Sequence, residues 1–134
     1  MNSIKFVVSL TPISKKNSQQ ILINRKTGRP FIAPSSRYKQ YLKDCAQYMP
    51  KVHIDEPVNV RCLFYMPTRR KCDLTNMLES IDDVMVHYGV LEDDNSNIIV
   101  GHDGSRVLYD KYNPRTEVYI ENLKKVLTYS LKGL

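Results

Sequence analysis

The sequence predicts an α+β protein, a single domain in which one mixed β-sheet is backed by two main helices. Two observations lead to this fold class. Short stretches in which apolar and polar residues alternate, as in strands, are separated by two longer stretches with apolar residues at helical spacing. The length of 134 residues is enough for one hydrophobic core and too short for two, so we expect one domain over residues 1–134.

The first half of the chain predicts a strand, a hairpin and a helix. Residues 4–10 alternate as a strand does, and residues 20–24 and 30–33 predict a hairpin whose turn is closed by Gly28 with a positive φ. Pro34-Ser35-Ser36 is typical of a helix start. Helical spacing then continues to about residue 49, with apolar positions at Tyr38, Tyr41, Leu42 and Cys45.

The second half predicts a buried strand, an amphipathic helix and three further strands. Residues 58–65 are mostly apolar and predict the buried strand. We expect a helix over residues 73–88, with Asp73 as an N-cap whose carboxylate accepts from the first turn and Gly89 as its stop. The remaining expectations are short strands at 98–100 and 106–109 around a turn at 101–104, a last strand at 116–120, and an amphipathic tail at 123–134.

Charge is distributed unevenly along the chain. The whole sequence carries 20 basic and 14 acidic residues, a net charge of +6, but residues 1–72 alone hold 14 of the basic residues and 3 of the acidic ones. Seven carboxylates and no Lys or Arg lie between Asp73 and Asp94. A basic front half followed by an acid-only stretch predicts a polyanionic partner with a cation site beside it.

The composition excludes several classes of protein. No apolar run approaches the roughly 18 residues of a membrane-spanning helix, and the apolar start of the chain alternates as a strand and is not typical of a signal peptide. The three cysteines are too widely spaced for a disulfide framework, and none lies at zinc-ligand spacing from another Cys or a His. These features favour a reducing cytoplasm and no membrane partner.

The polar face of the second helix has the residue types of a metal site. Thr75, Glu79 and Asp83 follow one another at i, i+4 and i+8, and Asp93 and Asp94 come after the helix. Clustered carboxylates without a basic partner are typical ligands of Mg²⁺, and two such ions about 3.5–4 Å apart support phosphodiester hydrolysis. The alternative is a solvated polar face, in which the carboxylates only keep the helix soluble.

Basic residues of the front half form clusters that fit a nucleic-acid surface. Each cluster alone is typical of a solvated face, whereas together they favour DNA. The clusters are Lys15 and Lys16; Arg25, Lys26 and Arg29; Arg37, Lys39 and Lys43; and Arg69, Arg70 and Lys71.

From Lys71 to Asp83 the sequence Lys-Cys-Asp-Leu-Thr-Asn-Met-Leu-Glu-Ser-Ile-Asp-Asp resembles the signature helix of the RusA-type Holliday junction resolvases. Three other segments agree with that family in order and spacing, over roughly residues 5–121: Pro12-x-x-Lys15-Lys16-Asn17, the helix start from Pro34 to Tyr41, and Gly89-Val90-Leu91-x-Asp93-Asp94. The resemblance implies a Mg²⁺-dependent, homodimeric endonuclease that acts on four-way DNA junctions in recombination and repair. Such proteins are often encoded by phages and prophages.

The resemblance also implies a metal site formed from two places in the chain. In the family, two aspartates of an Asp-x-Asp-Asn-Leu pattern join an aspartate pair after the helix. Asp73 matches the first aspartate, and Asp93 and Asp94 match the pair. Two positions depart from the family, because Thr75 stands in place of the second aspartate and Glu79 in place of a catalytic lysine. We expect Glu79, one turn along the same face, to supply the missing carboxylate.

The sequence therefore predicts an endodeoxyribonuclease that uses a metal-activated water. Mg²⁺, with Mn²⁺ as a possible substitute, is expected to be bound by Asp73, Asp93, Asp94 and Glu79, while Asp83 is expected to be solvated or at the rim of the site. The alternative is an attenuated family member that binds branched DNA without cutting it. In either case the DNA backbone is expected to be held by Lys15, Lys16, Asn17, Arg69, Arg70 and Lys71.

Overall fold

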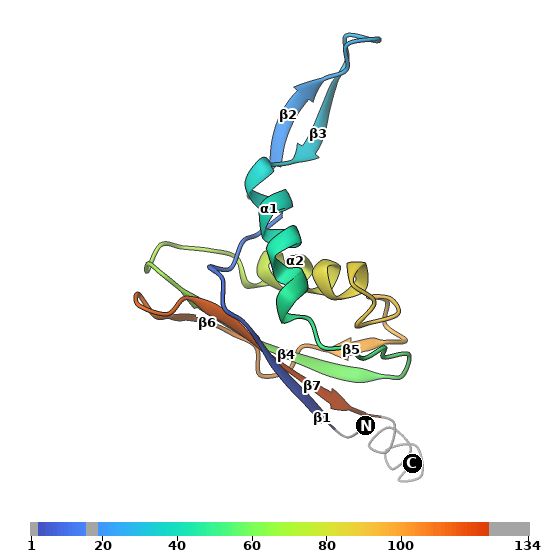
Figure 1. The fold of residues 1–134 in the computed structure, drawn as a ribbon, viewed down its shortest axis with the longest axis vertical. Helices are drawn as coiled ribbons and strands as arrows, with labels where there is room; N and C mark the ends of the chain where they lie inside the picture. Colours follow the sequence, from blue (N-terminus) through green and yellow to red (C-terminus); the bar gives the residue numbers. More distant parts are fainter. Residues whose placement is uncertain (1–2, 16–18, 124–134) are drawn as a thin grey trace.

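The computed structural model describes residues 3–15 and 19–123 of the chain. Within these ranges a five-stranded mixed sheet carries two α-helices on one face, and a two-stranded hairpin projects away from the sheet and helices (Figure 1). The predicted α+β fold class is confirmed. The tail predicted to be amphipathic lies, apart from residue 123, outside the described residues.

The sheet is organised around β4 (Val58–Met66), the buried strand predicted at residues 58–65. β7 (Arg115–Asn122) runs antiparallel to β4, and β1 (Ser3–Val8) runs antiparallel to β7. The register pairs Phe6 with Val118 and Val118 with Cys62, and all three are buried. Because side chains alternate between the faces of a sheet, one face of these strands is apolar and packs against the helices.

The edge of the sheet beyond β4 is formed by two short strands that follow one another. β5 (Ile99–Gly101) and β6 (Arg106–Tyr109) confirm the predicted strands around the 101–104 turn, and both run parallel to β4. Side chains of the intervening loop bond to β4 where the backbone ladder is interrupted. Nδ1 of His102 lies 2.9 Å from the carbonyl oxygen of Val60, and the N–H of Cys62 donates to Oγ of Ser105 at 3.0 Å.

The two helices begin and end close to the predicted positions. α1 (Ser36–Cys45) is capped by Ser35, and a 3₁₀ turn, η2 (Ala46–Tyr48), covers the remainder of the predicted helix. α2 (Leu74–His87) is followed by Gly89, which has the expected positive φ of 75°. Asp73 occupies the N-cap position of α2, but its side chain makes no capping hydrogen bond, so the prediction that its carboxylate caps the helix was wrong.

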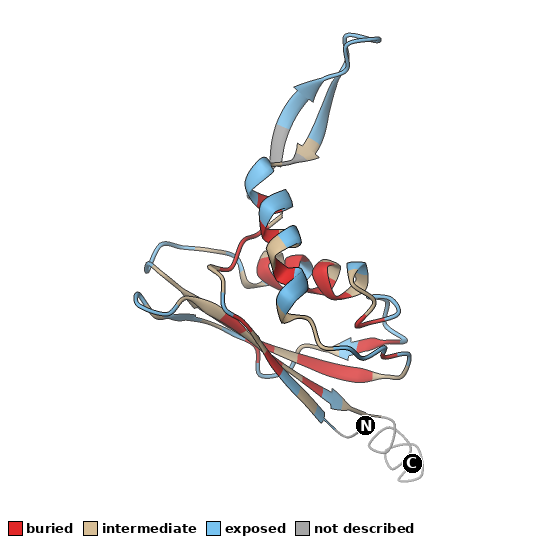
Figure 2. Cartoon of the chain, viewed as in Figure 1, coloured by how far each residue is buried: buried red, intermediate tan, exposed pale blue. Residues whose placement is uncertain are grey.

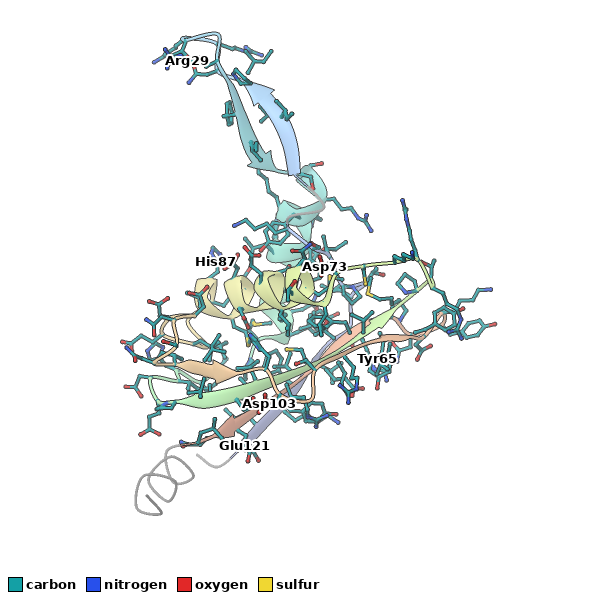
Figure 3. All side chains as sticks on the ribbon, turned by 180° about the vertical axis from the view of Figure 1, so that it is seen from behind. Arg29, Tyr65, Asp73, His87, Asp103 and Glu121 are labelled. Carbon is teal, nitrogen blue, oxygen red and sulfur yellow. The ribbon has the colours of Figure 1, made fainter. Side chains whose placement is uncertain are left out.

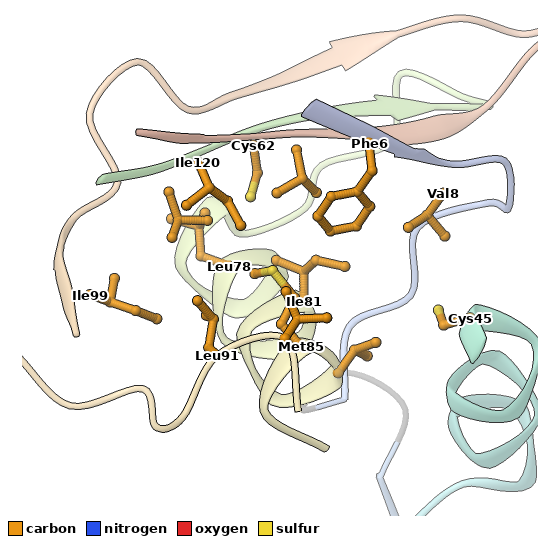
Figure 4. Packing of buried hydrophobic residues seen from close by; sticks show 14 of the residues in the cluster. Phe6, Val8, Cys45, Cys62, Leu78, Ile81, Met85, Leu91, Ile99 and Ile120 are labelled. Carbon is orange, nitrogen blue, oxygen red and sulfur yellow. The ribbon is translucent and has the colours of Figure 1, made fainter. Parts of the chain in front are cut away.

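The apolar stripe of α2 packs against one face of the sheet (Figure 4). Ile81, Val84 and Met85 are all at most 1% exposed and belong to one cluster with Val60 and Ile120 of the sheet. Figure 2 shows that buried residues are concentrated on α2 and on the strands beneath it. Full burial of a side chain of this size contributes about 1.5–3 kcal/mol, so α2 is held firmly against the sheet.

The hairpin is formed by β2 (Gln19–Ile23) and β3 (Pro30–Pro34), with Gly28 in its turn at φ +70°. Ile21, Ile23 and Ile32 are each more than two-thirds exposed, so the hairpin packs little of its apolar surface against the rest of the protein. Among the described residues, no helix is long and apolar enough to span a membrane.

Candidate active site

The predicted ligand Asp73 lies at the start of α2, where the chain arrives from β4 through residues 67–72 (Figure 3). Its side chain is exposed, and Oδ1 accepts a hydrogen bond from the Thr75 hydroxyl at 3.2 Å. Thr75 cannot supply the negative charge of an aspartate. It does contact the carboxylate of Asp73, and this hydrogen bond restricts the orientation of that carboxylate.

The loop after α2 carries the predicted pair Asp93 and Asp94. Both carboxylate oxygens of Asp93 accept hydrogen bonds within the loop and so stabilise its conformation. Oδ1 accepts from the N–H of Asp94 at 2.7 Å, and Oδ2 accepts from Nδ2 of Asn95 at 3.0 Å. Partial burial and the Asp93 side chain raise the pKa of Asp94, and the charge of Asp83 on α2 adds to this. The loop therefore presents Asp94 to the carboxylates of α2.

A buried ion pair joins α2 to the loop between β5 and β6. Oδ2 of Asp82 lies 2.9 Å from Nε2 of His102, whose Nδ1 faces the carbonyl of Val60. Because a carbonyl only accepts, Nδ1 carries a proton, and a second proton lies between Nε2 and Oδ2. The hydrogen bond to Asp82 raises the pKa of His102, while burial, with a contribution from Asp94, raises the pKa of Asp82.

Sequence reasoning missed this pair. Asp82 lies four residues after Leu78 and three before Met85, both of which are buried, so helical spacing places it on the covered face of α2. No pattern in the sequence identifies His102 as its partner. The other carboxylate oxygen of Asp82, Oδ1, is buried and has no hydrogen-bond partner in the described part of the chain.

Lys15 was predicted to contact DNA, and the structure places it against α2. Its Nζ lies 3.6 Å from Oδ2 of Asp83 and 5.9 Å from the centre of the Tyr38 ring. Asp83, which was expected to be solvated or at the rim of the site, is half-buried. Burial raises the pKa of Tyr38 to about 12, and the nearby charges of Asp83 and Glu79 contribute to the increase. A cation and a phenol therefore border the acidic face of α2.

The structure does not bring the four predicted ligands into one group. Glu79 is exposed on α2, where its charge acts on Tyr38 of α1. Within residues 3–15 and 19–123, no three His, Cys, Asp or Glu side chains are grouped closely enough to hold a metal ion. The electrostatic contacts that involve Asp94 are with Asp93 and with Asp82 and Asp83 of α2.

The cationic segment before α2 is accessible. Arg69, Arg70 and Lys71 are all exposed, and the guanidinium of Arg69 lies 4.3 Å from the centre of the Tyr109 ring on β6. This segment leads directly into Asp73, so positive and negative side chains adjoin at the start of α2. Lys16 and Asn17, the other predicted DNA contacts, lie outside the described residues.

Comparison with known proteins identifies the family. Residues 9–121 match the family described as Endodeoxyribonuclease RusA. The chain belongs to the RusA endodeoxyribonuclease family. A relative from Aquifex aeolicus (strain VF5), named Crossover junction endodeoxyribonuclease RusA, is 31% identical over 97 residues, which cover 71% of this chain and 75% of that protein. The predicted RusA-type resemblance and the predicted endodeoxyribonuclease class are thus confirmed.

The RusA match includes both the acidic and the cationic parts of the candidate site. It extends over the loop at residues 11–15, all of α1 and α2, and the aspartate pair after α2. The two departures from the RusA pattern, Thr75 and Glu79, are both exposed on α2. They therefore lie on the accessible side of the helix, where a substrate can reach them.

Proposed function

We propose that this chain resolves four-way (Holliday) DNA junctions as a Mg²⁺-dependent endonuclease, in a homodimer in which each subunit cuts one strand. The observation that carries the proposal is the set of carboxylates on α2 and its following loop, where Asp93 and the charge of Asp83 act on Asp94, in a chain whose cationic segment 69–71 precedes the start of α2. The printed name of the Aquifex relative, a crossover junction endodeoxyribonuclease, supports the branched substrate.

The donor atoms around α2 fit a divalent cation. All are oxygens, and burial, with a smaller contribution from neighbouring carboxylates, raises the pKa values of Asp82 and Asp94. Oδ1 of Asp82 is buried without a partner among the described residues. Hard divalent ions prefer such oxygen ligands and, when bound, supply Lewis-acid activation of water and of the phosphodiester. The residues proposed to hold the ion are Asp73, Asp93, Asp94 and Glu79.

The proposal requires the start of α2 and the loop at residues 92–97 to draw together around ion and DNA, because no group of three ligands is preassembled in the described chain. The chain's own residues then have distinct roles. Thr75 orients Asp73 through its hydrogen bond, and the segment 69–71 binds the DNA backbone. The ammonium of Lys15, next to Asp83, provides positive charge beside the acids although Glu79 occupies the position of the family lysine.

A cleavage assay on a labelled four-way junction tests the proposal. The wild-type chain is expected to produce paired nicks with Mg²⁺ and none with chelator, and Asp73→Asn and Asp94→Asn are each expected to bind the junction but leave it uncut. Asp55→Asn is the matched control, since Asp55 is an exposed carboxylate outside the acidic segment. Failure of the wild-type chain to cut any branched substrate with Mg²⁺ or Mn²⁺ would contradict the proposal.

The role of Glu79 has its own test. Glu79→Gln removes one negative charge while keeping the size of the side chain, so we expect cleavage to require a higher Mg²⁺ concentration. Cleavage by Glu79→Gln with an unchanged Mg²⁺ dependence would show that Glu79 does not replace the missing aspartate at Thr75.

The second candidate function is a branched-DNA-binding protein without nuclease activity. The two departures at Thr75 and Glu79 favour it, since both alter the charge of the accessible face of α2. A wild-type chain that shifts the junction on a native gel but leaves it intact under all metal conditions would identify this function.

A further inference from the structure

A cavity of about 500 Å³ lies beside the start of α2. Its wall is formed by the loop at residues 11–14, the start of α1 and the segment that follows β4. Three cationic side chains line it, and no carboxylate does. The three are Arg37, Arg70 and Lys71.

These three cations come from two distant parts of the chain, and none of them has a counterion among the described residues. Arg37 lies on α1, whereas Arg70 and Lys71 precede α2, and no ion pair to any of them occurs within the described ranges. Because the three positive charges lie at one cavity, an anion that binds there is attracted by all of them. The remaining wall combines Thr hydroxyls with an apolar part that includes Met66 and Met77. A phosphate with its attached sugar matches this division into cationic and apolar parts.

The cavity adjoins Asp73 at the start of α2. Lys71 and Cys72 line both this cavity and a second one of about 360 Å³, which also borders Asp73 and Asn76. The wall of the cationic cavity is therefore continuous with the pocket that borders Asp73. At the cavity, the negative charge of a DNA strand would be matched by Arg37, which belongs to the predicted basic clusters but not to the six residues expected to hold the DNA backbone.

We propose that the cavity lined by Arg37, Arg70 and Lys71 binds a backbone phosphate of the DNA strand next to the one that is cut, with Arg37 as a specific phosphate contact. The inference rests on the proposed function, because the DNA substrate supplies the phosphate. Bidentate guanidinium groups are well suited to phosphate oxygens, and contacts of this kind fix the register of a strand at the site.

Cys72 provides a reporter for the cavity in the unmodified chain. Cys45 and Cys62 are buried, whereas Cys72 is half-buried and lies in the cavity wall. The rate of N-ethylmaleimide addition to Cys72 is measured by peptide mass spectrometry at one fixed pH, with chelator present so that DNA stays intact. We expect saturating junction DNA to slow the addition by about tenfold, as for a thiol covered by a bound charged group. The same labelling rate is measured with inorganic phosphate at millimolar concentration in place of DNA, to test whether a free anion protects Cys72.

Two variants test the contact directly. Arg37→Gln and Lys51→Gln each remove one exposed positive charge, but only Arg37 lines the cavity, and Lys51 lies outside the basic clusters that predict a nucleic-acid surface. For Arg37→Gln we expect about tenfold weaker junction binding and a slope of log K against log salt that is shallower by about 0.9, the loss of one phosphate contact. Lys51→Gln is expected to retain the wild-type slope.

The outcomes separate this inference from the proposed function. In one outcome, the wild-type chain cleaves the junction while Cys72 labelling is unchanged by DNA or the salt slopes of both variants are identical. That result would contradict phosphate binding at the cavity and would still support the nuclease activity. Protection of Cys72 by inorganic phosphate but not by DNA would also overturn it, since the cavity would then bind a free anion. Protection of Cys72 by junction DNA together with a shallower salt slope for Arg37→Gln, in a chain that does not cut, supports the phosphate contact while the nuclease activity fails.

Discussion

Removing the imidazole of His102 is expected to destabilise the chain by about 3 kcal/mol near neutral pH, because it leaves the carboxylate of Asp82 buried and unpaired. The magnitude follows from burial and geometry. Nε2 of His102 lies 2.9 Å from Oδ2 of Asp82, and the Asp82 and His102 side chains are 10% and 25% exposed. Because His102 is only partly buried, we take the lower end of the range of about 3–5 kcal/mol for breaking a buried ion pair. His102→Ala is the perturbation, and urea denaturation followed by far-UV circular dichroism is the assay, since the chain has no Trp.

The pH dependence makes the prediction sharper. The pKa of His102 is raised by Asp82, so the pair's stabilisation is complete below about pH 6.5, the ordinary pKa of histidine, and is lost as pH rises through the raised pKa. One bound proton corresponds to a slope of about 1.4 kcal/mol per pH unit. In His102→Ala the loss of stability is expected to shrink on acidification, because the pKa of Asp82 is raised and its carboxyl becomes neutral.

Asp82→Asn is the matched variant. Its amide N–H₂ can donate to Nε2 of a neutral His102, so the contact persists without a titrating carboxyl, and we expect a cost of only about 1 kcal/mol. Its free energy of unfolding should be nearly flat between pH 6.5 and 9, where that of the wild-type chain falls. Parallel curves for the wild type and Asp82→Asn in this range would refute the assignment of a proton to the pair.

Three further substitutions are expected to lower the free energy of unfolding, each measured by the same denaturation assay. Gly104→Ala should cost about 2–3 kcal/mol, because its φ is +85° and a Cβ would lie 2.6 Å from the side chain of Arg61. Gly28→Ala, which also has a positive φ but open space around it, should cost only about 1 kcal/mol. Equal losses for the two variants would contradict the steric argument. Ser80→Ala should cost about 1–3 kcal/mol, since its buried hydroxyl donates to the Ile13 carbonyl at 2.6 Å. A loss under about 0.5 kcal/mol, roughly the error of the assay, would contradict this. Ser35→Ala should cost about 1 kcal/mol by removing the N-cap of α1, and an unchanged midpoint would refute that role.

The elements of the fold could be predicted well because their signals are local. The alternation of residues 58–65 and the apolar stripe of α2 follow directly from the periods of strands and helices, and Gly89 ends α2 as expected. The pairing of β5 and β6 with β4 was not predictable in this way. It depends on His102 and Ser105 bonding to β4 over more than 40 intervening residues, and no sequence period records such a contact.

The candidate site was predictable in its residue types and less so in its arrangement. The acid-only stretch after a basic segment indicated a metal and a polyanion, and the family match supports that interpretation. The structure instead shows Lys15 turned toward Asp83, and Asp82 buried with His102. Both contacts join segments far apart in the chain, and their geometry depends on how the first loop and the 102–105 loop pack on α2.

The projecting hairpin of β2 and β3 has a consequence for how this chain tolerates change. In the part of the chain that the structure describes, no residue between Ser14 and Arg37 belongs to the hydrophobic core, whose members resume at Tyr38. Insertions, deletions or a grafted peptide at the turn near Gly28 therefore remove no packing between α2 and the sheet. The turn near Gly28 is therefore an accessible place to attach a fluorophore, because no described residue of the hairpin contributes to the hydrophobic core.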